Sequence, residues 1–478
     1  MFSNYHGLSA CTSILAGKKA TADGSTMIGR NEDAKSAWPK HMIVHPHQEN
    51  IKNNHYTSPA PDNNFSIDLP STSFKYTATP EWTNKFGTYE EDGINEFNVA
   101  MSATESAYAN PRVLGYDPLS ENGIAEEAMI SVVLPFIKSA REGVERLGQI
   151  VTTHGAAEIN GILFADKNEV WYMEIGSGHH WVAQRIPDNS YAVVANQLAI
   201  QEIDFSDHDN FITSPAIQNF VSHNHLNVTN KGFNFRNIFG TQSYMDEIYN
   251  TPRVWYGQKL FNPEIKQDPM SENMPFIRQA DHLLQRDDFE KFLSSHYQET
   301  NYDPIGVGDD ADKHKFRPIS LAKTQESHIL QIRPNMPDEL KGIHWLALGV
   351  AAQSVYVPFY ASATDTHPAY KVGTHDYSPD SAYWVYKLVG VLVDPHYLEF
   401  GKLLSDTQKE LYAQYTNLLM ETDNHALTLE GNSRIEYLTK QSIHFQQLGI
   451  DKMHALTSQL ITQATDMSPL NFKTDRNL

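Results

Sequence analysis

The chain has 478 residues, with 58 acidic and 37 basic side chains, a formal net charge of −21 and a single cysteine, Cys11. A protein this acidic repels phosphate backbones and anionic lipids, so we expect neither nucleic acid nor membranes as partners. One cysteine excludes an intramolecular disulfide and any zinc or redox site of the CxxC type. The length and a hydrophobic fraction of 40% fit about three domain equivalents, or one large globular domain with an appended subdomain.

The beginning of the chain lacks the usual targeting signals. Residues 1–10, MFSNYHGLSA, contain neither the basic segment nor the apolar stretch of a secretory signal peptide. No later stretch approaches the roughly 18 consecutive apolar residues of a membrane-spanning helix. These features predict a cytoplasmic protein.

The first predicted element is a β-hairpin that starts at the cysteine. Residues 11–31 contain two short β-prone runs on either side of an Asp-Gly turn. Opposed residues of an antiparallel pair have numbers with a constant sum, so a centre near Thr21 places Cys11 opposite a residue close to Asn31. The segment from Arg30 to Asp33 is therefore predicted to lie beside Cys11.

The rest of the chain divides into a mixed region and a helical tail. Residues 47–80 are rich in Asn, Ser, Thr and Pro and predict a long surface excursion. Ser139 and Glu142 form a capping box that opens a helix ending at Gly155. Beyond about residue 381 the apolar spacing is helical, which predicts an α-rich region on a mixed sheet-and-helix core. Strands are predicted at 92–104, 161–166, 169–175, 191–197, 327–333 and 346–359. Those at 161–166, 169–175 and 191–197 are separated by turn-forming residues and are expected to be consecutive antiparallel strands.

Metal and phosphate motifs are absent from the sequence. The chain contains 22 histidines but no HExxH motif, and its close histidine pairs have no suitably spaced carboxylate. The acidic run from Gly308 to Asp312 lacks the full pattern of a calcium loop and is interpreted as a solvated loop. There is no GxSxG nucleophile elbow and no GxxxxGKS/T phosphate loop. We therefore predict no metal and no other cofactor.

Cys11 is the residue whose surroundings suit nucleophilic catalysis. A thiolate is the reactive form of cysteine, and its formation needs a nearby base or cation. In the predicted hairpin Arg30 supplies the cation, and Asp33 is placed to orient either group. The alternative is that Cys11 is a small hydrophobic residue of the core, as many free cysteines are. The residues alone leave both interpretations open.

The segment CTSILAGKKATADGSTMIGRNED resembles the amino terminus of the PepD-type cysteine dipeptidases, members of the N-terminal nucleophile (Ntn) hydrolase superfamily. The pattern of a cysteine followed by Arg-Asn-x-Asp is shared with bile salt hydrolases and penicillin V acylases. Later stretches are similar to the dipeptidase branch in the same order, and together they cover most of residues 11–360: DGINEFNVAMSATES, GHHWVAQRIPDNSYAVVANQ, NTPRVWYGQ, and ESHILQIR followed by HWLALG and VYVPFY.

This resemblance implies a fold of the α+β class. It predicts a four-layer αββα core of the Ntn type over residues 11–360 and a mostly helical region over residues 361–478. It also implies that residues 1–10 are a propeptide, removed autocatalytically at the Ala10-Cys11 bond. The freed α-amino group of Cys11 would accept the thiol proton, because its pKa of about 7.7 to 8.0 leaves a useful unprotonated fraction near neutrality.

The resemblance also implies roles for individual side chains. Arg30 matches the arginine that lies beside the thiol, and Asp33 matches the aspartate that holds the amine. Asn196 resembles an asparagine that binds the substrate or the developing oxyanion in the acylases. Arg253 resembles their late catalytic arginine.

Two positions are assigned less directly. A second oxyanion asparagine of the acylases falls near Thr104-Glu105 in this sequence, so the resemblance leaves the oxyanion hole incomplete. Residues 179–181 are interpreted mainly as packing and cleft wall, with His180 as a candidate substrate-binding residue. Both positions depend on a three-dimensional arrangement that the sequence does not give.

The predicted function is the metal-independent hydrolysis of dipeptides, with Cys11 forming a thioester intermediate. A first alternative keeps the fold and hydrolyses a non-peptide amide, as an acylase does. A second is a non-catalytic interaction protein related to the secernins, which share the amino-terminal pattern. A metallodipeptidase is the third. The side-chain preference for the dipeptide and the oligomeric state, a homo-oligomer included, stay open.

Overall fold

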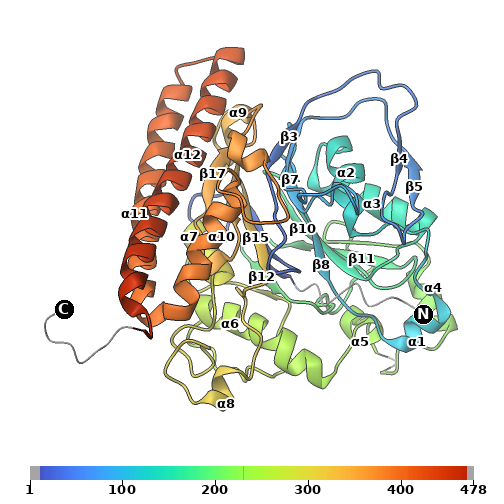
Figure 1. The fold of residues 1–478 in the computed structure, drawn as a ribbon. Helices are drawn as coiled ribbons and strands as arrows, with labels where there is room; N and C mark the ends of the chain where they lie inside the picture. Colours follow the sequence, from blue (N-terminus) through green and yellow to red (C-terminus); the bar gives the residue numbers. More distant parts are fainter. Residues whose placement is uncertain (1–10, 230, 471–478) are drawn as a thin grey trace, which may run out of the picture.

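Two antiparallel β-sheets form the centre of the molecule (Figure 1). The computed structural model describes residues 11–229 and 231–470, so the predicted propeptide, residues 1–10, lies outside the described residues. One sheet has seven strands, in the order β14 (Ile277–Arg278), β12 (Tyr191–Val194), β1 (Thr12–Ala16), β2 (Thr26–Asp33), β15 (Thr324–Ile332), β16 (Gly342–Leu348) and β17 (Val357–Tyr360). The other has six, in the order β13 (Phe211–Thr213), β11 (Trp181–Ile186), β10 (Val170–Ile175), β9 (Asn160–Ala165), β8 (Ala100–Ser106) and β7 (Asp92–Ile94).

Helices flank the sheets and dominate the C-terminal region. The predicted helix after Ser139 is α3 (Ala140–His154), where Ser139 Oγ accepts a hydrogen bond from Glu142 N at 3.2 Å. The predicted helical tail is confirmed, since its helices are α10 (Ala382–Val393), α11 (Tyr397–Ala426) and α12 (Gly431–Ala464). The other α-helices of the described residues are α1 (Pro111–Tyr116), α2 (Glu126–Val133), α4 (Ile217–His223), α5 (Phe235–Phe239), α6 (Thr251–Phe261), α7 (Arg286–Leu293), α8 (Asp310–Lys313) and α9 (Asp338–Lys341).

The predicted amino-terminal hairpin is confirmed. β1 and β2 pair antiparallel, with Thr12 opposite Asn31 and Ser13 opposite Arg30, which is one position from the predicted pairing. Gly24 in the connection has a φ of 77°, a left-handed conformation that glycine adopts without steric penalty. On its other side β1 pairs with β12, so the first described strand lies inside the sheet rather than at an edge.

Successive side chains of β1 point alternately into two hydrophobic layers. Ile14 and Ala16 belong to a core shared with α6, α7 and α10 to α12, whereas Leu15 belongs to the core between the two sheets. The outer face of the six-stranded sheet packs on α2 and α3. The layers therefore follow the order helices, sheet, sheet, helices (Figure 1). Because Cys11 is four residues before Leu15, its side chain points into the layer between the sheets.

Some strand predictions are wrong in their boundaries. Residues 92–104 form two strands, β7 and β8, because Asn98 adopts a φ of 58° and Asn95 Oδ1 accepts hydrogen bonds from the next turn, including Val99 N at 3.1 Å. Residues 346–359 likewise contain parts of two strands, β16 and β17. The first run conceals a turn made by side-chain hydrogen bonds, and the second conceals a short 3₁₀ helix, Ala351–Gln353.

The three runs between 161 and 197 are not consecutive strands of one sheet. The first two are β9 and β10, and their next neighbour is β11, which the sequence did not predict. The third is β12, which crosses to the other sheet and places Val194 opposite Ser13 of β1. This crossing carries the segment that contains Asn196 toward the start of β1.

Two predicted loop regions contain short regular elements. Within and next to residues 47–80, β3 (Ile43–His45) pairs with β6 (Tyr76–Ala78), and β4 (His55–Thr57) pairs with β5 (Ser66–Asp68). The acidic run after Gly308 includes α8, whose N-terminus is capped by Asp309 Oδ1 accepting from Asp312 N at 2.9 Å. These strands and this helix have only three or four residues each, too few for the hydrophobic periodicity of the sequence to predict them.

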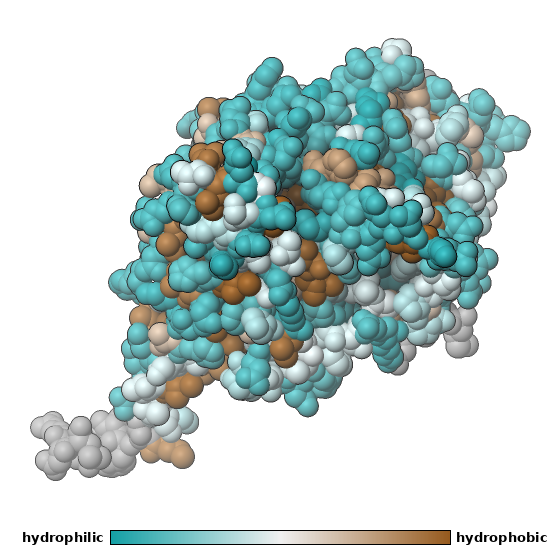
Figure 2. Space-filling view, turned by 90° about the horizontal axis from the view of Figure 1, so that it is seen from above, coloured by the Kyte–Doolittle hydropathy of each residue, from teal (hydrophilic) through white to brown (hydrophobic). Residues whose placement is uncertain are grey.

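Hydrophilic and apolar residues are interspersed on the face of the molecule seen in Figure 2. Figure 2 shows a mostly hydrophilic face on which apolar residues are scattered in small groups. Among the helices of residues 11–229 and 231–470, none has both the length and the apolarity to cross a bilayer.

Close packing of α3 on the six-stranded sheet yields a test of the fold. A Cβ atom on Gly148 would lie 2.1 Å from Cζ2 of Trp181, so Gly148→Ala should lower the free energy of unfolding by about 1 to 3 kcal/mol, despite the better helix propensity of alanine. Gly115 in α1 is exposed with nothing within 4 Å of such a Cβ, so Gly115→Ala is the matched control and should not destabilise. Urea unfolding measures both, and equal effects would contradict the packing.

Candidate active site

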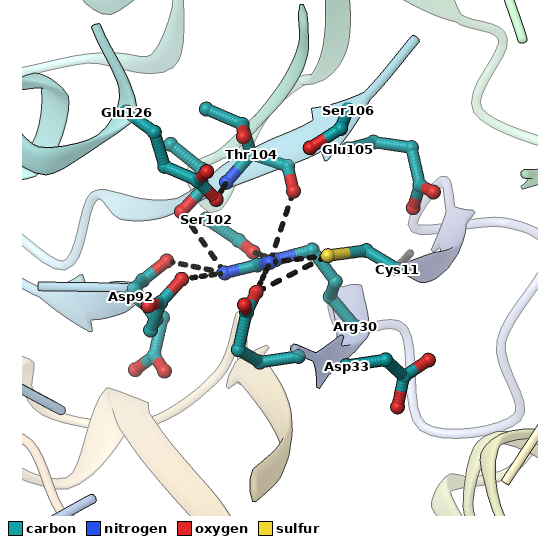
Figure 3. Close-up of polar contacts among 12 residues, drawn as sticks. Cys11, Arg30, Asp33, Asp92, Ser102, Thr104, Glu105, Ser106 and Glu126 are labelled. Carbon is teal, nitrogen blue, oxygen red and sulfur yellow. Dashed lines mark hydrogen bonds and ion pairs between the residues drawn. The ribbon is translucent and has the colours of Figure 1, made fainter. Parts of the chain in front are cut away.

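Cys11 lies directly before β1, with its thiol buried between the sheets (Figure 3). Its Sγ donates to Glu32 Oε2 at 3.1 Å and accepts from Arg30 Nη1 at 3.1 Å. Burial raises the pKa of the thiol well above its usual value, Glu32 raises it further, and Arg30 opposes both. In the chain as it stands, with Cys11 inside a peptide bond, these influences hold the thiol protonated.

Arg30 is fully buried and is hydrogen-bonded along its whole guanidinium. It comes from β2 and reaches across to the six-stranded sheet, where Ser102 and Thr104 lie on β8. Besides Cys11 and Glu32, its acceptors are Ser102 Oγ at 2.9 Å from Nε, the Thr104 carbonyl at 3.0 Å from Nη1, and the Ala103 carbonyl and Glu91 Oε2, each at 2.9 Å from Nη2. The thiol is thereby fixed relative to both sheets.

Near the thiol of Cys11 the buried carboxyl groups outnumber the buried cations. The carboxyl groups are those of Glu32, Glu91 and Glu126, and the cations are Arg30 and Lys40. Lys40 is ion-paired with Glu91, and Arg30 with Glu32 and Glu91. Burial, reinforced by Glu32, raises the pKa of Glu91 to about 7. Burial, reinforced by Glu91, raises the pKa of Glu126 to about 8. Part of this cluster is therefore protonated at neutral pH.

Two groups in the described part of the chain bring three metal-type ligand atoms close together. In one, Glu32, Glu91 and Glu126, the cations Arg30 and Lys40 pair with Glu32 and Glu91, and Glu126 accepts from Thr104 N at 3.3 Å. In the other, formed by Asp92, Glu326 and His328, the histidine Nδ1 bonds both carboxylates, at 2.9 and 3.1 Å. Within the described residues, ion pairs therefore engage two of the three carboxyl groups in the first group and all three residues of the second.

His328 supports Arg30 from the other side. Its Nε2 lies 2.9 Å from the same Ser102 Oγ that accepts from Arg30 Nε. Burial alone would lower the pKa of His328, but Asp92 and Glu326 outweigh it and raise the pKa to about 9. The imidazole is therefore protonated at neutral pH and donates at both nitrogens.

Asn196 and Arg253 meet at the main chain of Cys11. Arg253, on α6, donates through Nη1 to the Cys11 carbonyl and to Thr12 Oγ1, the latter at 2.8 Å. Its Nη2 donates to Asn196 Oδ1 at 2.7 Å, and Asn196 Nδ2 donates to the Ser106 carbonyl at 2.8 Å. An amide nitrogen has two N–H donors, so Ser106 accounts for only one of them.

Asp33 lies on the opposite face of β2 from Arg30, as the spacing of three residues requires. Its carboxylate accepts from Arg317 Nη2 and from Thr324 Oγ1, both at 2.5 Å. Arg317 Nη1 in turn approaches Thr12 Oγ1 at 3.4 Å. Asp33 is therefore connected to the backbone side of Cys11, not to its thiol.

His180 lies away from this group. It lies directly before β11, where its Nδ1 is 3.1 Å from Ser214 Oγ and its ring packs on Phe220 with centroids 4.2 Å apart. Within the described residues no hydrogen bond joins it to Cys11, Arg30 or Arg253. A substrate-binding role for His180 stays a prediction.

Several residues of the site were not found from the sequence. Glu32 was within reach, because it alternates with Arg30 on β2 and must share its face. Glu91, Glu105 and Arg317 come from distant segments, and only the packing of the two sheets and the loop before β15 brings them to Cys11. No local pattern marks them.

Comparisons with known proteins identify the family of the chain. The profile of Peptidase family C69 matches residues 10–410, and the chain belongs to this family of peptidases, which are hydrolases. A probable dipeptidase of Latilactobacillus sakei is 48% identical over 98% of this chain and 99% of its own. A probable dipeptidase B of Lactococcus lactis is 41% identical over 97% of both chains, and dipeptidase A of Lactobacillus helveticus is 38% identical over 95% and 96%. The resemblance to dipeptidases predicted from the sequence is confirmed.

The raised pKa of Glu126 predicts a specific dependence of stability on pH. Its folded pKa of about 8 exceeds the unfolded value, so the folded state retains a proton that the unfolded state releases, and stability falls as pH rises from about 4.5 to 8. Glu126→Gln removes this penalty. The unfolding free energy of the variant relative to wild type should rise across that window, by at most about 1.4 kcal/mol per pH unit.

Urea titrations at pH 5 and pH 8 measure this difference. The exposed Glu436 on α12 provides the control, because Glu436→Gln should give the same difference at both pH values. A Glu126→Gln difference that does not change with pH would contradict the assignment of a buried, largely protonated carboxyl.

Proposed function

We propose that this chain is a cysteine dipeptidase whose nucleophile is Cys11, and that its αββα layers are an Ntn-hydrolase core. The observation that carries the proposal is the contact of Arg30 Nη1 with Cys11 Sγ at 3.1 Å, at the residue directly before the interior strand β1. The family match, which begins at residue 10, and the dipeptidase names of relatives aligned over nearly the whole chain support the same reading.

The proposed activation step is removal of residues 1–10, which creates an α-amino group on Cys11. This group has a pKa of about 7.7 to 8.0 and is tethered next to its own thiol, so it provides a proton acceptor suited to neutral pH. Arg30 then stabilises the thiolate, and Asp33 and Arg253 position the main chain of Cys11.

In the proposed reaction the thiolate attacks the peptide carbonyl, and the C–N bond breaks as the α-ammonium passes its proton to the departing amino acid. Water then hydrolyses the thioester, giving its proton back to the amine and releasing the second amino acid. The second N–H of the Asn196 side chain is the proposed donor to the oxyanion in both halves of the reaction.

Replacement of Cys11 is the direct test. Intact-mass analysis should show wild type without residues 1–10 and Cys11→Ala with them, and the variant should have no dipeptidase activity. Wild type should be inactivated by iodoacetamide and should keep its activity in chelator. An active Cys11→Ala protein would refute the proposal, and inactivation by chelator alone would favour a metallodipeptidase.

A panel that contains both dipeptides and N-acyl amides separates a dipeptidase from an acylase. If wild type retains residues 1–10 and shows no thiol-dependent turnover of either class, a non-catalytic interaction protein is favoured. Preferential turnover of N-acyl amides would favour the acylase.

Asn196→Ala tests the oxyanion donor. Loss of one such donor costs about 10²- to 10³-fold in kcat, so kcat should fall in this range with KM changed much less. The alkylation rate of Cys11 by iodoacetamide should stay near the wild-type rate, which shows that the nucleophile is intact. A KM effect without a kcat effect would assign Asn196 to ground-state binding instead.

A further inference from the structure

Glu105 places a carboxylate beside Cys11 that the proposed reaction does not use. It lies on β8, and its Oε2 accepts a hydrogen bond from Ser13 Oγ of β1 (Figure 3 shows the side chains of Glu105 and Cys11 near each other). Ser13 and Cys11 are two residues apart, so their side chains share the inter-sheet face of β1, about 7 Å apart along the strand. The Glu105 carboxylate therefore lies one side-chain repeat from the nucleophile.

The second oxygen of this carboxylate has no partner. Glu105 is fully buried, and its Oε1 has no hydrogen-bonding group within reach in the described part of the chain. A buried carboxylate oxygen without a donor costs free energy, so such a position needs an explanation. Burial raises the pKa of Glu105 to about 8, with Arg253 opposing the rise, so at neutral pH the group is largely protonated until a cation reaches it and favours the carboxylate.

The neighbouring cations are already engaged elsewhere. Arg30 pairs with Glu32 and Glu91, and Arg253 binds the Cys11 carbonyl and Asn196. Neither donates to Glu105 in the hydrogen bonds described. The carboxylate is thus oriented by Ser13 but has no cation of its own.

We propose that Glu105 binds the α-ammonium group of the amino-terminal residue of the substrate, and so makes a free amino terminus a requirement for cleavage. This inference rests on the proposed function, because it takes the nucleophile to be Cys11. The ammonium nitrogen is only about 2.5 Å from the carbonyl carbon that is attacked. With an attack distance of about 3 to 3.5 Å and an N–H···O distance of about 2.8 Å, a carboxylate one strand repeat from Cys11 is within reach.

The same geometry explains selection against substrates whose α-amino group is blocked or missing. A substrate without the amine leaves Oε1 unpaired and buried, and a site built around a polar partner rejects analogues that lack it.

The test compares two substrates that differ only in the amine, alanyl-leucine and propionyl-leucine, on wild type and Glu105→Gln. Wild type should prefer alanyl-leucine in kcat/KM, and Glu105→Gln should reduce that preference by about 10- to 100-fold, the range for loss of one hydrogen bond to a charged group. The reduction should come from alanyl-leucine alone. Intact mass and the iodoacetamide reactivity of Cys11 confirm that the variant is processed and retains its nucleophile.

Glu290→Gln is the matched control. Glu290 on α7 is also fully buried, with a pKa that burial raises to about 8, but it lies beside Arg286 on the other side of the seven-stranded sheet. Its substitution should leave the substrate preference unchanged. If Glu105→Gln does not fold, Glu105→Asp replaces it, and should raise the KM of alanyl-leucine while preserving a preference for the amine.

The outcomes separate this inference from the proposed function. Equal losses on both substrates in Glu105→Gln, or no change on either, would overturn the inference and leave the dipeptidase in place. For Glu105→Asp, wild-type kinetics on both substrates would overturn it equally. A wild-type protein that hydrolyses neither substrate would overturn the proposed function, and the inference with it.

Discussion

The structure depends on the burial of one guanidinium, that of Arg30, between the two sheets. An unpaired charge in such a place would cost several kcal/mol, so the groups that neutralise it must all be positioned at once. Ser102 and Glu91 come from the six-stranded side, and Glu32 and Cys11 from the seven-stranded side. The contacts that neutralise Arg30 therefore fix the position of one sheet relative to the other and, at the same time, the position of the thiol.

The charged groups around Cys11 are mostly acidic, and acidic groups disfavour a thiolate rather than stabilise it. Glu32 contacts the thiol, and Glu105 and Glu126 both raise its pKa further, which burial has already raised. A positive group arriving in this site gains Coulomb energy from several buried carboxyls, in a region of low dielectric where that energy is large. Both the amine of a newly formed terminus and the amine of a substrate are such groups, and either would help to stabilise the thiolate.

The sequence predicted the parts of this site that depend on local geometry. The hairpin, and with it the proximity of Cys11 to Arg30, follows from an Asp-Gly turn and the arithmetic of antiparallel pairing. Asn196 and Arg253 came only from resemblance, because β12 crosses between sheets and α6 is remote in sequence. Glu105 was visible only as a departure from the related families. Its unpartnered oxygen is a property of sheet-on-sheet packing, which no periodicity encodes.

An N-terminal nucleophile also has a mechanical requirement, since chain termini are poorly ordered unless they are held. Here β1 pairs with β12 on one side and β2 on the other, so the residues after Cys11 are hydrogen-bonded across both edges. Arg253 binds the Cys11 carbonyl itself, and Arg317 links Thr12 to Asp33. These contacts are made by the main chain of Cys11 and by residues after it. They would therefore hold the proposed nucleophile after the proposed cleavage before Cys11, which adds the amine that the proposed chemistry requires.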